Sequence, residues 1–191
     1  GLGGIGLAAV MGARVRGAAE IIGVDPVASR RETALGLGAT HVVDPGAEDV
    51  TAAIKTRTGR RGADIVFEAV GRAATIETAF AATRPGGTTC VVGAASTTEQ
   101  FSLPAHDLYI RGKTVVGCQY GSVVPGRDFP MLLDLWRTGR LPLDRLITRR
   151  IGLDQVNEAF DDLNSGKGIR SVIVNDTAAA DGHTRPTTGY S

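Results

Sequence analysis

Short apolar runs rich in valine and isoleucine alternate along this chain with longer segments of helical periodicity. Such runs are typical of strands buried in a parallel sheet, and we expect them at residues 20–25, 40–44, 63–70, 88–94 and 113–120. The intervening segments predict helices over residues 4–18, 28–37, 48–59 and 73–82, the last followed by a turn at residues 84–87. Gly38 suits a left-handed cap at the end of the second helix, and the third helix is expected to end at Gly59. Strands and helices alternating at this spacing predict right-handed crossovers and a doubly wound parallel α/β sheet.

The pattern changes after Tyr120, where the regular alternation of strand and helix stops. Residues 129–139 are amphipathic and predict a helix, Asp154 is the expected N-cap of a further helix, and residues 170–175 predict a last strand. The final segment is small, polar and without periodicity, which is typical of a disordered tail. We therefore expect an α/β domain over residues 1–120, part of a second domain over residues 121–176 and a tail over residues 177–191.

The charge balance excludes some classes of partner. The 21 lysines and arginines against 20 aspartates and glutamates give a formal net charge of +1, which provides no overall field to attract nucleic acid or an anionic membrane. No apolar stretch approaches the roughly 18 to 20 residues that span a bilayer. Cys90 and Cys118 lack C-x-x-C spacing, which argues against a zinc knuckle or a disulfide framework. We therefore expect a cytoplasmic protein whose partners are small molecules.

The chain opens with a glycine-rich turn that has the spacing of a dinucleotide-binding motif. Gly1, Gly3 and Gly6 satisfy G-x-G-x-x-G, in which the first glycine makes the tight turn, the second admits a pyrophosphate and the third lets the helix pack closely. By itself the motif is a weak signal, because a loop before a helix of small residues has the same pattern. Here it opens a predicted helix whose N-terminal amides would face an anion, and a strand follows.

That strand ends in Asp25, at the distance from the glycines where a ribose-binding acid is expected. A carboxylate there accepts hydrogen bonds from the adenosine ribose and repels a 2'-phosphate, which favours NAD over NADP. The alternative is a simple turn former before Pro26. Arg30 and Arg31 follow closely and weaken the preference for NAD, although exposed helix residues are the simpler interpretation of both.

In this order and spacing, five segments resemble the C-terminal two-thirds of a zinc-dependent medium-chain alcohol dehydrogenase: GLGGIGLAAVMGARVRGAAEIIGVD, LGATHVVD, DIVFEAVGR, RPGGTTCVVG and GIRSVIV. The resemblance runs from Gly1 to about Val174. The segment GRDFPMLLDLWRTGRLPLDRLITRRIGLDQVNEAF is most similar to the class III branch, which acts on thiol adducts such as S-hydroxymethyl-glutathione or S-hydroxymethyl-mycothiol. The expected fold is then a Rossmann sheet followed by the C-terminal part of the catalytic domain.

The resemblance assigns cofactor contacts residue by residue. It implies a pyrophosphate turn, a ribose acid and a basic residue beside the adenosine at Gly1, Gly3, Gly4, Ile5, Gly6, Asp25 and Arg30. It implies the adenine and ribose side at Val70 and Arg72, for which a strand-end hydrophobe and a solvated arginine are the alternatives. Main-chain groups that hold the nicotinamide carboxamide are implied at Val92, Gly93, Ala94, Cys118 and Tyr120. Arg170 matches a basic residue near the pyrophosphate, and a surface arginine is its alternative.

The resemblance also implies the reaction. A catalytic zinc binds the alcohol oxygen, and hydride passes from an alcohol or a thiol-aldehyde adduct to NAD. In the family the zinc ligands precede the glycine motif, and His41, His106 and His183 show no ligand spacing, so we expect no catalytic and no metal-binding residue in this chain. A homodimer or homotetramer, formed through an edge strand near residues 114–118, is likewise implied.

The expected strand order is 3-2-1-4-5-6, and the central first strand would precede Gly1. Without it, the strands at residues 20–25 and 63–70 would face each other across a gap wider than normal by one strand, about 4.8 Å. We therefore expect a fragment, inactive alone, whose complete parent is the enzyme. The alternative is a catalytically inactive module that binds nucleotide or associates with another subunit.

Overall fold

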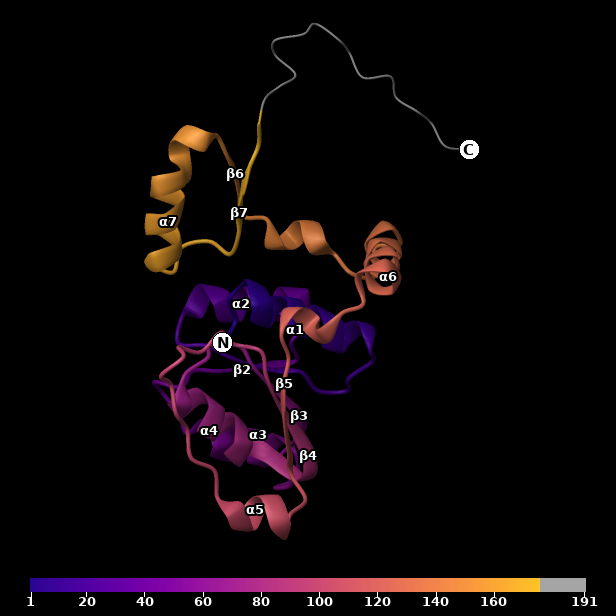
Figure 1. Cartoon of the computed structure of the whole chain (residues 1–191), viewed down its shortest axis with the longest axis vertical. Helices are drawn as coiled ribbons and strands as arrows, with labels where there is room; N and C mark the ends of the chain where they lie inside the picture. The colour runs from indigo at the N-terminus through magenta and orange to yellow at the C-terminus, as the bar shows by residue number, and fades with distance from the viewer. Residues whose placement is uncertain (176–191) are drawn as a thin grey trace, which may run out of the picture. The chain divides into compact units, whose positions relative to one another are not determined.

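The computed structural model describes residues 1–175, which form two compact units (Figure 1). The first unit is Gly1–Leu146 and the second begins at Ile147. The expected tail over residues 177–191 lies outside the described residues. No helix among the described residues is both long and apolar enough to cross a membrane.

The first unit contains two parallel sheets. Strand β1 (Ile22–Val24) pairs with β2 (His41–Val43), and β3 (Ala63–Glu68), β4 (Thr83–Val91) and β5 (Thr114–Gly117) form the second sheet in that order. All pairs are parallel, which confirms the predicted α/β class. Within the described residues no ladder joins β1 to β3, and this break lies where the sequence placed the central strand.

The helices of the first unit follow the predicted pattern closely. They are α1 (Gly4–Val15), α2 (Ala28–Leu37), α3 (Val50–Arg57), α4 (Ala73–Ala82), α5 (Ala105–Tyr109) and α6 (Pro125–Arg137), with 3-10 turns at Tyr120–Ser122 and Leu143–Leu146. Asp49 caps α3, because its Oδ1 accepts from the amide of Ala52 at 2.6 Å. Gly38 is the C-cap of α2 and has a φ of 122°, which confirms the predicted cap. Helix α3 ends at Arg57, two residues before Gly59, which has a φ of 59°.

Two apolar clusters hold this unit together. Helix α1 buries Leu7, Val10 and Met11, and α4 buries Ile76, Ala79 and Phe80 at the i, i+3, i+4 spacing of one helix face. Helix α4 packs on β3 and β4, and α3 packs against α4 (Figure 1). The buried hydroxyls of Thr83 and Thr89 are hydrogen-bonded to each other at 2.8 Å, so their burial leaves no polar atom unpaired.

Four local predictions need correction. Residues 84–87 are a bulge inside β4 rather than a turn before it, because Ala63 pairs with Thr83 and Ile65 already pairs with Thr88. Helix α6 begins at Pro125 instead of residue 129, since proline is tolerated in a first helical turn. Asp154 is not a helix N-cap: it lies in a 3-10 turn, and Gln155 precedes α7. Helix α5 was not predicted.

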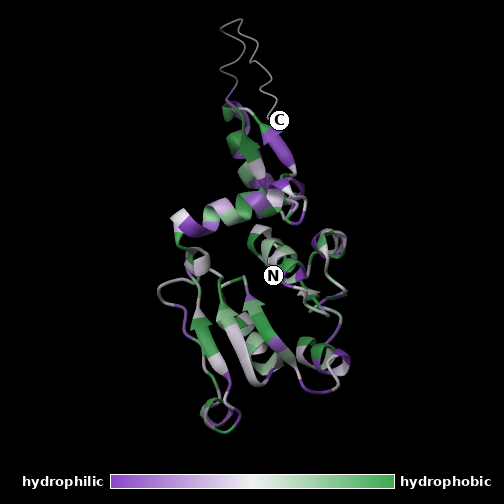
Figure 2. Cartoon of the chain, turned by 90° about the vertical axis from the view of Figure 1, so that its right-hand side faces the viewer, coloured by the Kyte–Doolittle hydropathy of each residue, from purple (hydrophilic) through white to green (hydrophobic). Residues whose placement is uncertain are grey.

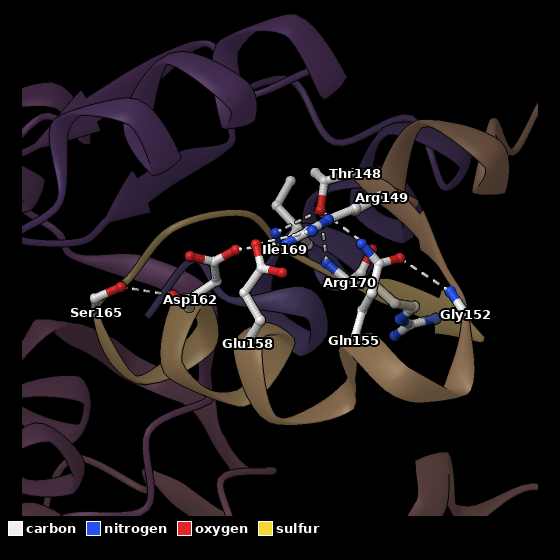
Figure 3. Close-up of polar contacts among 9 residues, drawn as sticks. All are labelled: Thr148, Arg149, Gly152, Gln155, Glu158, Asp162, Ser165, Ile169 and Arg170. Atoms are coloured by element: carbon white, nitrogen blue, oxygen red, sulfur yellow. Dashed lines mark hydrogen bonds and ion pairs between the residues drawn. The ribbon is translucent and has the colours of Figure 1, made fainter.

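The second unit pairs β6 (Arg149–Ile151) with β7 (Ser171–Ile173) in parallel, and joins them through a 3-10 turn (Leu153–Gln155) and α7 (Val156–Asn164). Strand β6 was not predicted. The Arg149 guanidinium contacts Glu158 and Asp162 on one face of α7, each at 2.9 Å (Figure 3). These ion pairs raise the pKa of Arg149. They fix α7 beside β6 and leave an apolar groove lined by Phe160, Leu163 and Ile173.

Lys113 is the buried cation of the first unit. Its Nζ donates to the Phe80 carbonyl at 2.7 Å, near the C-terminus of α4, and lies 3.4 Å from Asp107. The ammonium also sits 4.6 Å from the centre of the Phe80 ring. Burial lowers the pKa of Lys113, and Asp107 partly offsets this. The side chain therefore adds a charged donor to a carbonyl that also accepts from the Thr83 amide at the end of α4.

Replacing Lys113 by methionine keeps the apolar stem and removes the donor. We expect Lys113→Met to lower the free energy of unfolding by about 1 to 3 kcal/mol, because the charged hydrogen bond to the Phe80 carbonyl and the ion pair with Asp107 are both lost. Urea unfolding followed by circular dichroism measures this. The control is Lys167→Met at an exposed site, where we expect a change within about 0.5 kcal/mol. Equal stability of the two variants would contradict a capping role for Lys113.

Candidate cofactor site

The predicted site residues of the first unit gather at one edge of its sheets. Strands β1, β3, β4 and β5 are in parallel sheets, so their carboxyl ends point the same way within each sheet. In Figure 2 the arrowheads of the three-stranded sheet lie at its end nearest the chain N-terminus. In open α/β sheets this is the edge where ligands bind.

The glycine turn meets the spatial demands of the motif. A Cβ on Gly6 would overlap the Gly1 carbonyl, with the Gly1 carbon only 2.8 Å away, so the turn closes only around glycine. A Cβ on Gly3 would meet nothing within 4 Å, which leaves open space at the start of α1. Gly4 and Ile5 form the first helical positions, and the Ile5 side chain is exposed. The third glycine is thus required by the turn itself rather than by packing on the sheet.

Asp25 lies just after β1, and its carboxylate is buried. Oδ2 accepts from the Leu2 amide at 2.7 Å and Oδ1 accepts from the Val27 amide at 2.8 Å. The first bond fixes the glycine turn against the end of β1. Each carboxylate oxygen has a further lone pair, so the group keeps acceptor capacity.

Arg30 and Arg31 on α2 are half-buried rather than exposed, which corrects the simpler interpretation of these residues. The Arg31 guanidinium donates to the Asp25 carbonyl at 2.7 Å and pairs with Asp44 at 2.9 Å. Arg30 is placed differently: its Nη1 lies 3.9 Å from Asp25 Oδ2. Its Nε is buried and has no hydrogen-bond partner among residues 1–175. A donor of this kind beside the glycine turn is suited to an oxygen-rich ligand.

The loop after β3 brings Val70 and Arg72 to the same edge. A Cβ built on Gly1 would lie 2.7 Å from Val70 Cγ2, so this loop borders the glycine turn. Val70 is partly exposed, and Arg72 is an exposed residue that precedes α4. Glu68 was not predicted as a site residue: it is the buried last residue of β3, and its carboxylate accepts from the amides of Val70 and Gly71. The available signal was an acid at the carboxyl end of a mostly apolar strand.

An open cleft lies beyond the ends of β4 and β5. It has a volume of about 650 Å³ and includes five predicted residues, Val92, Gly93, Ala94, Cys118 and Tyr120. Its lining also includes Gln119 and Ser122, which no sequence motif indicated. Tyr120 is largely exposed and contacts Phe129 edge-on, with ring centres 6.5 Å apart. Glycine is required at position 93, because a Cβ there would meet the Val70 carbonyl carbon at 2.6 Å.

The two cysteines are free and close to this cleft. Burial raises the pKa of the Cys90 thiol, and the neighbouring Cys118 raises it further. A raised pKa keeps a thiol protonated and unreactive. Cys118 lines the cleft, and its amide donates to the Val91 carbonyl at 2.9 Å. Its backbone role toward a cofactor stays a prediction.

Arg170 belongs to the second unit and lies just before β7. Its amide donates to Thr148 Oγ1 at 3.2 Å, and its carbonyl accepts from the Thr148 amide at 2.9 Å (Figure 3). These contacts hold the backbone of the residue and leave its side chain exposed. Its contact with a cofactor remains a prediction.

The part of the chain that the structure describes contains no cluster of metal ligands. No three histidine, cysteine, aspartate or glutamate side chains are grouped there to hold an ion. His41 contacts Thr40, and His106 lies 3.8 Å from Asp107 at an exposed position. His183 lies outside the described residues. The described residues therefore do not fit a zinc ion.

Comparisons with known proteins agree with this geometry. The zinc-binding dehydrogenase family matches residues 4–137. Geraniol dehydrogenase from Castellaniella defragrans is 41% identical over 175 residues, and an NDMA-dependent alcohol dehydrogenase from Amycolatopsis methanolica is 40% identical over 177 residues. Each match covers 91% of this chain, and 46% and 47% of the respective relatives. The chain thus spans about half the length of these relatives.

Solved structures give the same result. Benzyl alcohol dehydrogenase from Acinetobacter calcoaceticus matches 91% of this chain and 47% of its own with a TM-score of 0.87 and 35% identity. A structure from Sinorhizobium meliloti 1021 bound to NADP matches 91% of this chain and 50% of its own, with a TM-score of 0.79 and 31% identity. A class-3 alcohol dehydrogenase from Caenorhabditis elegans is 32% identical over 179 residues, covering 91% of this chain and 46% of its own. This match does not single out the class III branch, because other alcohol dehydrogenases are more similar. By the extent of the family match, this chain belongs to the zinc-binding dehydrogenase family, with alcohol dehydrogenases among its relatives.

Proposed function

We propose that this chain binds NAD and is the cofactor-binding part of an alcohol dehydrogenase. The observation that carries the proposal is the continuous row formed by the glycine turn, the Val70 loop and the cleft at the ends of β4 and β5. Family membership supports the same conclusion. The bound nicotinamide would accept hydride from the alcohol carbon.

The pyrophosphate would bind at the start of α1. Gly3 precedes this helix and has no side chain to accept from its first amides, so these amides are available to an anion. The open space at Gly3 lets a phosphate approach the backbone. The buried, unpartnered Nε of Arg30 would be satisfied by an oxygen of the cofactor.

The nicotinamide end would lie in the cleft. The Val92 amide already donates to the Glu68 carbonyl, and the Cys118 amide to the Val91 carbonyl. We therefore propose that the carbonyls of Val92 and Cys118 accept from the carboxamide of the cofactor. Main-chain recognition of this kind would fix which face of the ring meets the substrate.

The cofactor preference depends on Asp25. Its buried carboxylate would accept from the adenosine ribose and repel a 2'-phosphate. One relative is bound to NADP, and in this chain Arg30 and Arg31 lie near Asp25. We propose NAD because Asp25 follows β1 at the distance from the glycines where the motif expects the ribose-binding acid.

The substrate and the metal complete the proposal. The names of two relatives, geraniol dehydrogenase and NDMA-dependent alcohol dehydrogenase, support an alcohol as hydride donor. A thiol-aldehyde adduct is a narrower hypothesis for the substrate. The catalytic zinc would be held by residues outside this chain, because the described residues do not fit it. Association of two copies through the edge strand β5 is a further hypothesis.

Gly3→Ala tests the pyrophosphate site. We expect NAD affinity to fall at least about tenfold, because a methyl group would occupy the space where the phosphate approaches the backbone. The free protein should tolerate the change, since Gly3 has φ −72° and a Cβ there would meet no atom within 4 Å. Isothermal calorimetry measures the affinity. The matched control is Gly12→Ala within α1, where the Cβ also meets nothing within 4 Å and binding should not change.

Calorimetry with NAD and NADP tests the role of Asp25. We expect the unaltered chain to bind NAD at least about tenfold more tightly than NADP, because the carboxylate repels the 2'-phosphate. Asp25→Asn should narrow the ratio of the NAD and NADP affinities, because the charge is removed. Oδ1 can still accept from the Val27 amide, but the bond from the Leu2 amide is lost, so the ratio rather than either affinity alone is the readout. Tighter binding of NADP by the unaltered chain would remove Asp25 from this role.

Metal removal tests the proposed division of labour. In the active dehydrogenase that contains this chain, we expect dialysis against a chelator to abolish alcohol oxidation and added zinc to restore it. NAD affinity should stay unchanged, because the residues proposed to bind NAD form no metal-ligand group. Full alcohol oxidation without zinc would overturn the metal part of the proposal and leave NAD binding standing.

A further inference from the structure

Glu68 is a buried acid that forms no ion pair within residues 1–175. Its carboxylate is instead surrounded by neutral donors from the residues that follow it. Oε1 accepts from the Val70 amide at 2.8 Å, from the Gly71 amide at 3.0 Å and from the Thr75 hydroxyl at 2.8 Å. Oε2 accepts from the Gly71 amide at 3.1 Å. One side chain therefore fixes the loop after β3 to the first turn of α4.

The main chain of the same residue holds a second segment. The Glu68 carbonyl accepts from the amide of Val92 at 2.8 Å and from that of Gly93 at 2.9 Å. A Cβ on Gly71 would lie 2.6 Å from the Ala94 carbonyl carbon, so the loops after β3 and β4 are in direct backbone contact. Glu68 thus binds both loops, one through its carboxylate and one through its carbonyl.

We propose that Glu68 is a positioning residue that sets the adenosine-side loop at Val70 against the nicotinamide-side segment at Val92 and Gly93. This inference rests on the proposed function. The carboxylate fixes the turn from Glu68 to Gly71, and this turn orients the carbonyl that holds Val92 and Gly93. A dinucleotide that spans both segments then meets them at a fixed spacing.

The chemistry of the contacts calls for a carboxylate. The backbone amides of Val70 and Gly71 that face the two oxygens can only donate, and an ionised carboxylate is the side chain that only accepts. A glutamine can keep an oxygen at the Oε1 position, but it then turns an NH2 group toward the Gly71 amide and removes the negative charge. The substitution preserves size and weakens the hydrogen bonds, so it tests the pairing rather than the packing.

The experiment is calorimetry on the full chain with NAD, AMP and nicotinamide mononucleotide. Glu68→Gln should weaken NAD binding about tenfold, the equivalent of one lost bond to a charged group. The affinities for AMP and for nicotinamide mononucleotide should each fall less than about threefold, because each half of the cofactor contacts only one segment. If Glu68 had only a structural role, the variant would be less stable to heat, and its affinities for NAD, AMP and nicotinamide mononucleotide would change by similar factors.

The matched control is Glu99→Gln, at the same end of α4. Glu99 accepts only from the exposed Ala73 amide, and a glutamine keeps that acceptor, so all three ligands should bind as before. Unchanged NAD affinity in Glu68→Gln would overturn the proposal. An equal loss for AMP and NAD would also overturn it, since Glu68 would then act on the adenosine side alone. If Glu68→Gln does not fold, Thr75→Val removes one donor to the carboxylate. We then expect NAD affinity to fall about two- to threefold, with a smaller loss for AMP and nicotinamide mononucleotide.

A second readout separates this inference from the proposed function. If the unaltered chain binds no NAD, the proposed function fails, and hydrogen exchange then decides the role of Glu68. We expect Glu68→Gln to increase amide exchange in residues 69–73 and 91–95 together, because both loops lose their common support. Faster exchange in residues 69–73 alone would overturn the coupling of the two loops.

Discussion

Backbone segments at the cofactor edge approach one another more closely than any side chain allows, and the site depends on this constraint. Gly6 lies against the Gly1 carbonyl, and Gly93 lies against the Val70 and Gly71 backbone. At each place a single methyl group would force the segments apart. These contacts bring the glycine turn, the Val70 loop and the cleft into one row, which a dinucleotide of extended shape could follow.

Two buried carboxylates stabilise these close approaches. Asp25 accepts from the amides of Leu2 and Val27, and Glu68 accepts from those of Val70 and Gly71. Both groups are held mainly by backbone donors rather than by a tight ion pair. Amides have fixed positions, so a carboxylate that binds them transmits the position of one strand end to the next segment of chain. The link from β3 to the segment after β4 comes from the Glu68 carbonyl, which accepts from the amides of Val92 and Gly93.

The features that the sequence predicted depend on local periodicity or local conformation. The apolar runs located all five strands of the first unit, and Gly38 located the end of α2. The motif spacing predicted that the glycine turn and Asp25 lie near each other. In the structure the Asp25 carboxylate accepts from the amide of Leu2 in that turn. The predictions of a turn at residues 84–87 and of a cap before α7 were wrong, because proline and glycine in a bulge look like a turn and a polar residue in a 3-10 turn looks like a cap.

The sequence by itself determined the parallel α/β class and the glycine turn, since both follow from residue type and spacing along the chain. The five predicted residues that line the cleft came from the resemblance to a known family. The tertiary structure alone decided what these residues contact. Glu68 became a support for two loops only when β3 and β4 paired, and Arg30 and Arg31 became half-buried only when α2 packed beside β1 and β2. Both outcomes depend on neighbours distant in sequence, which no local pattern encodes.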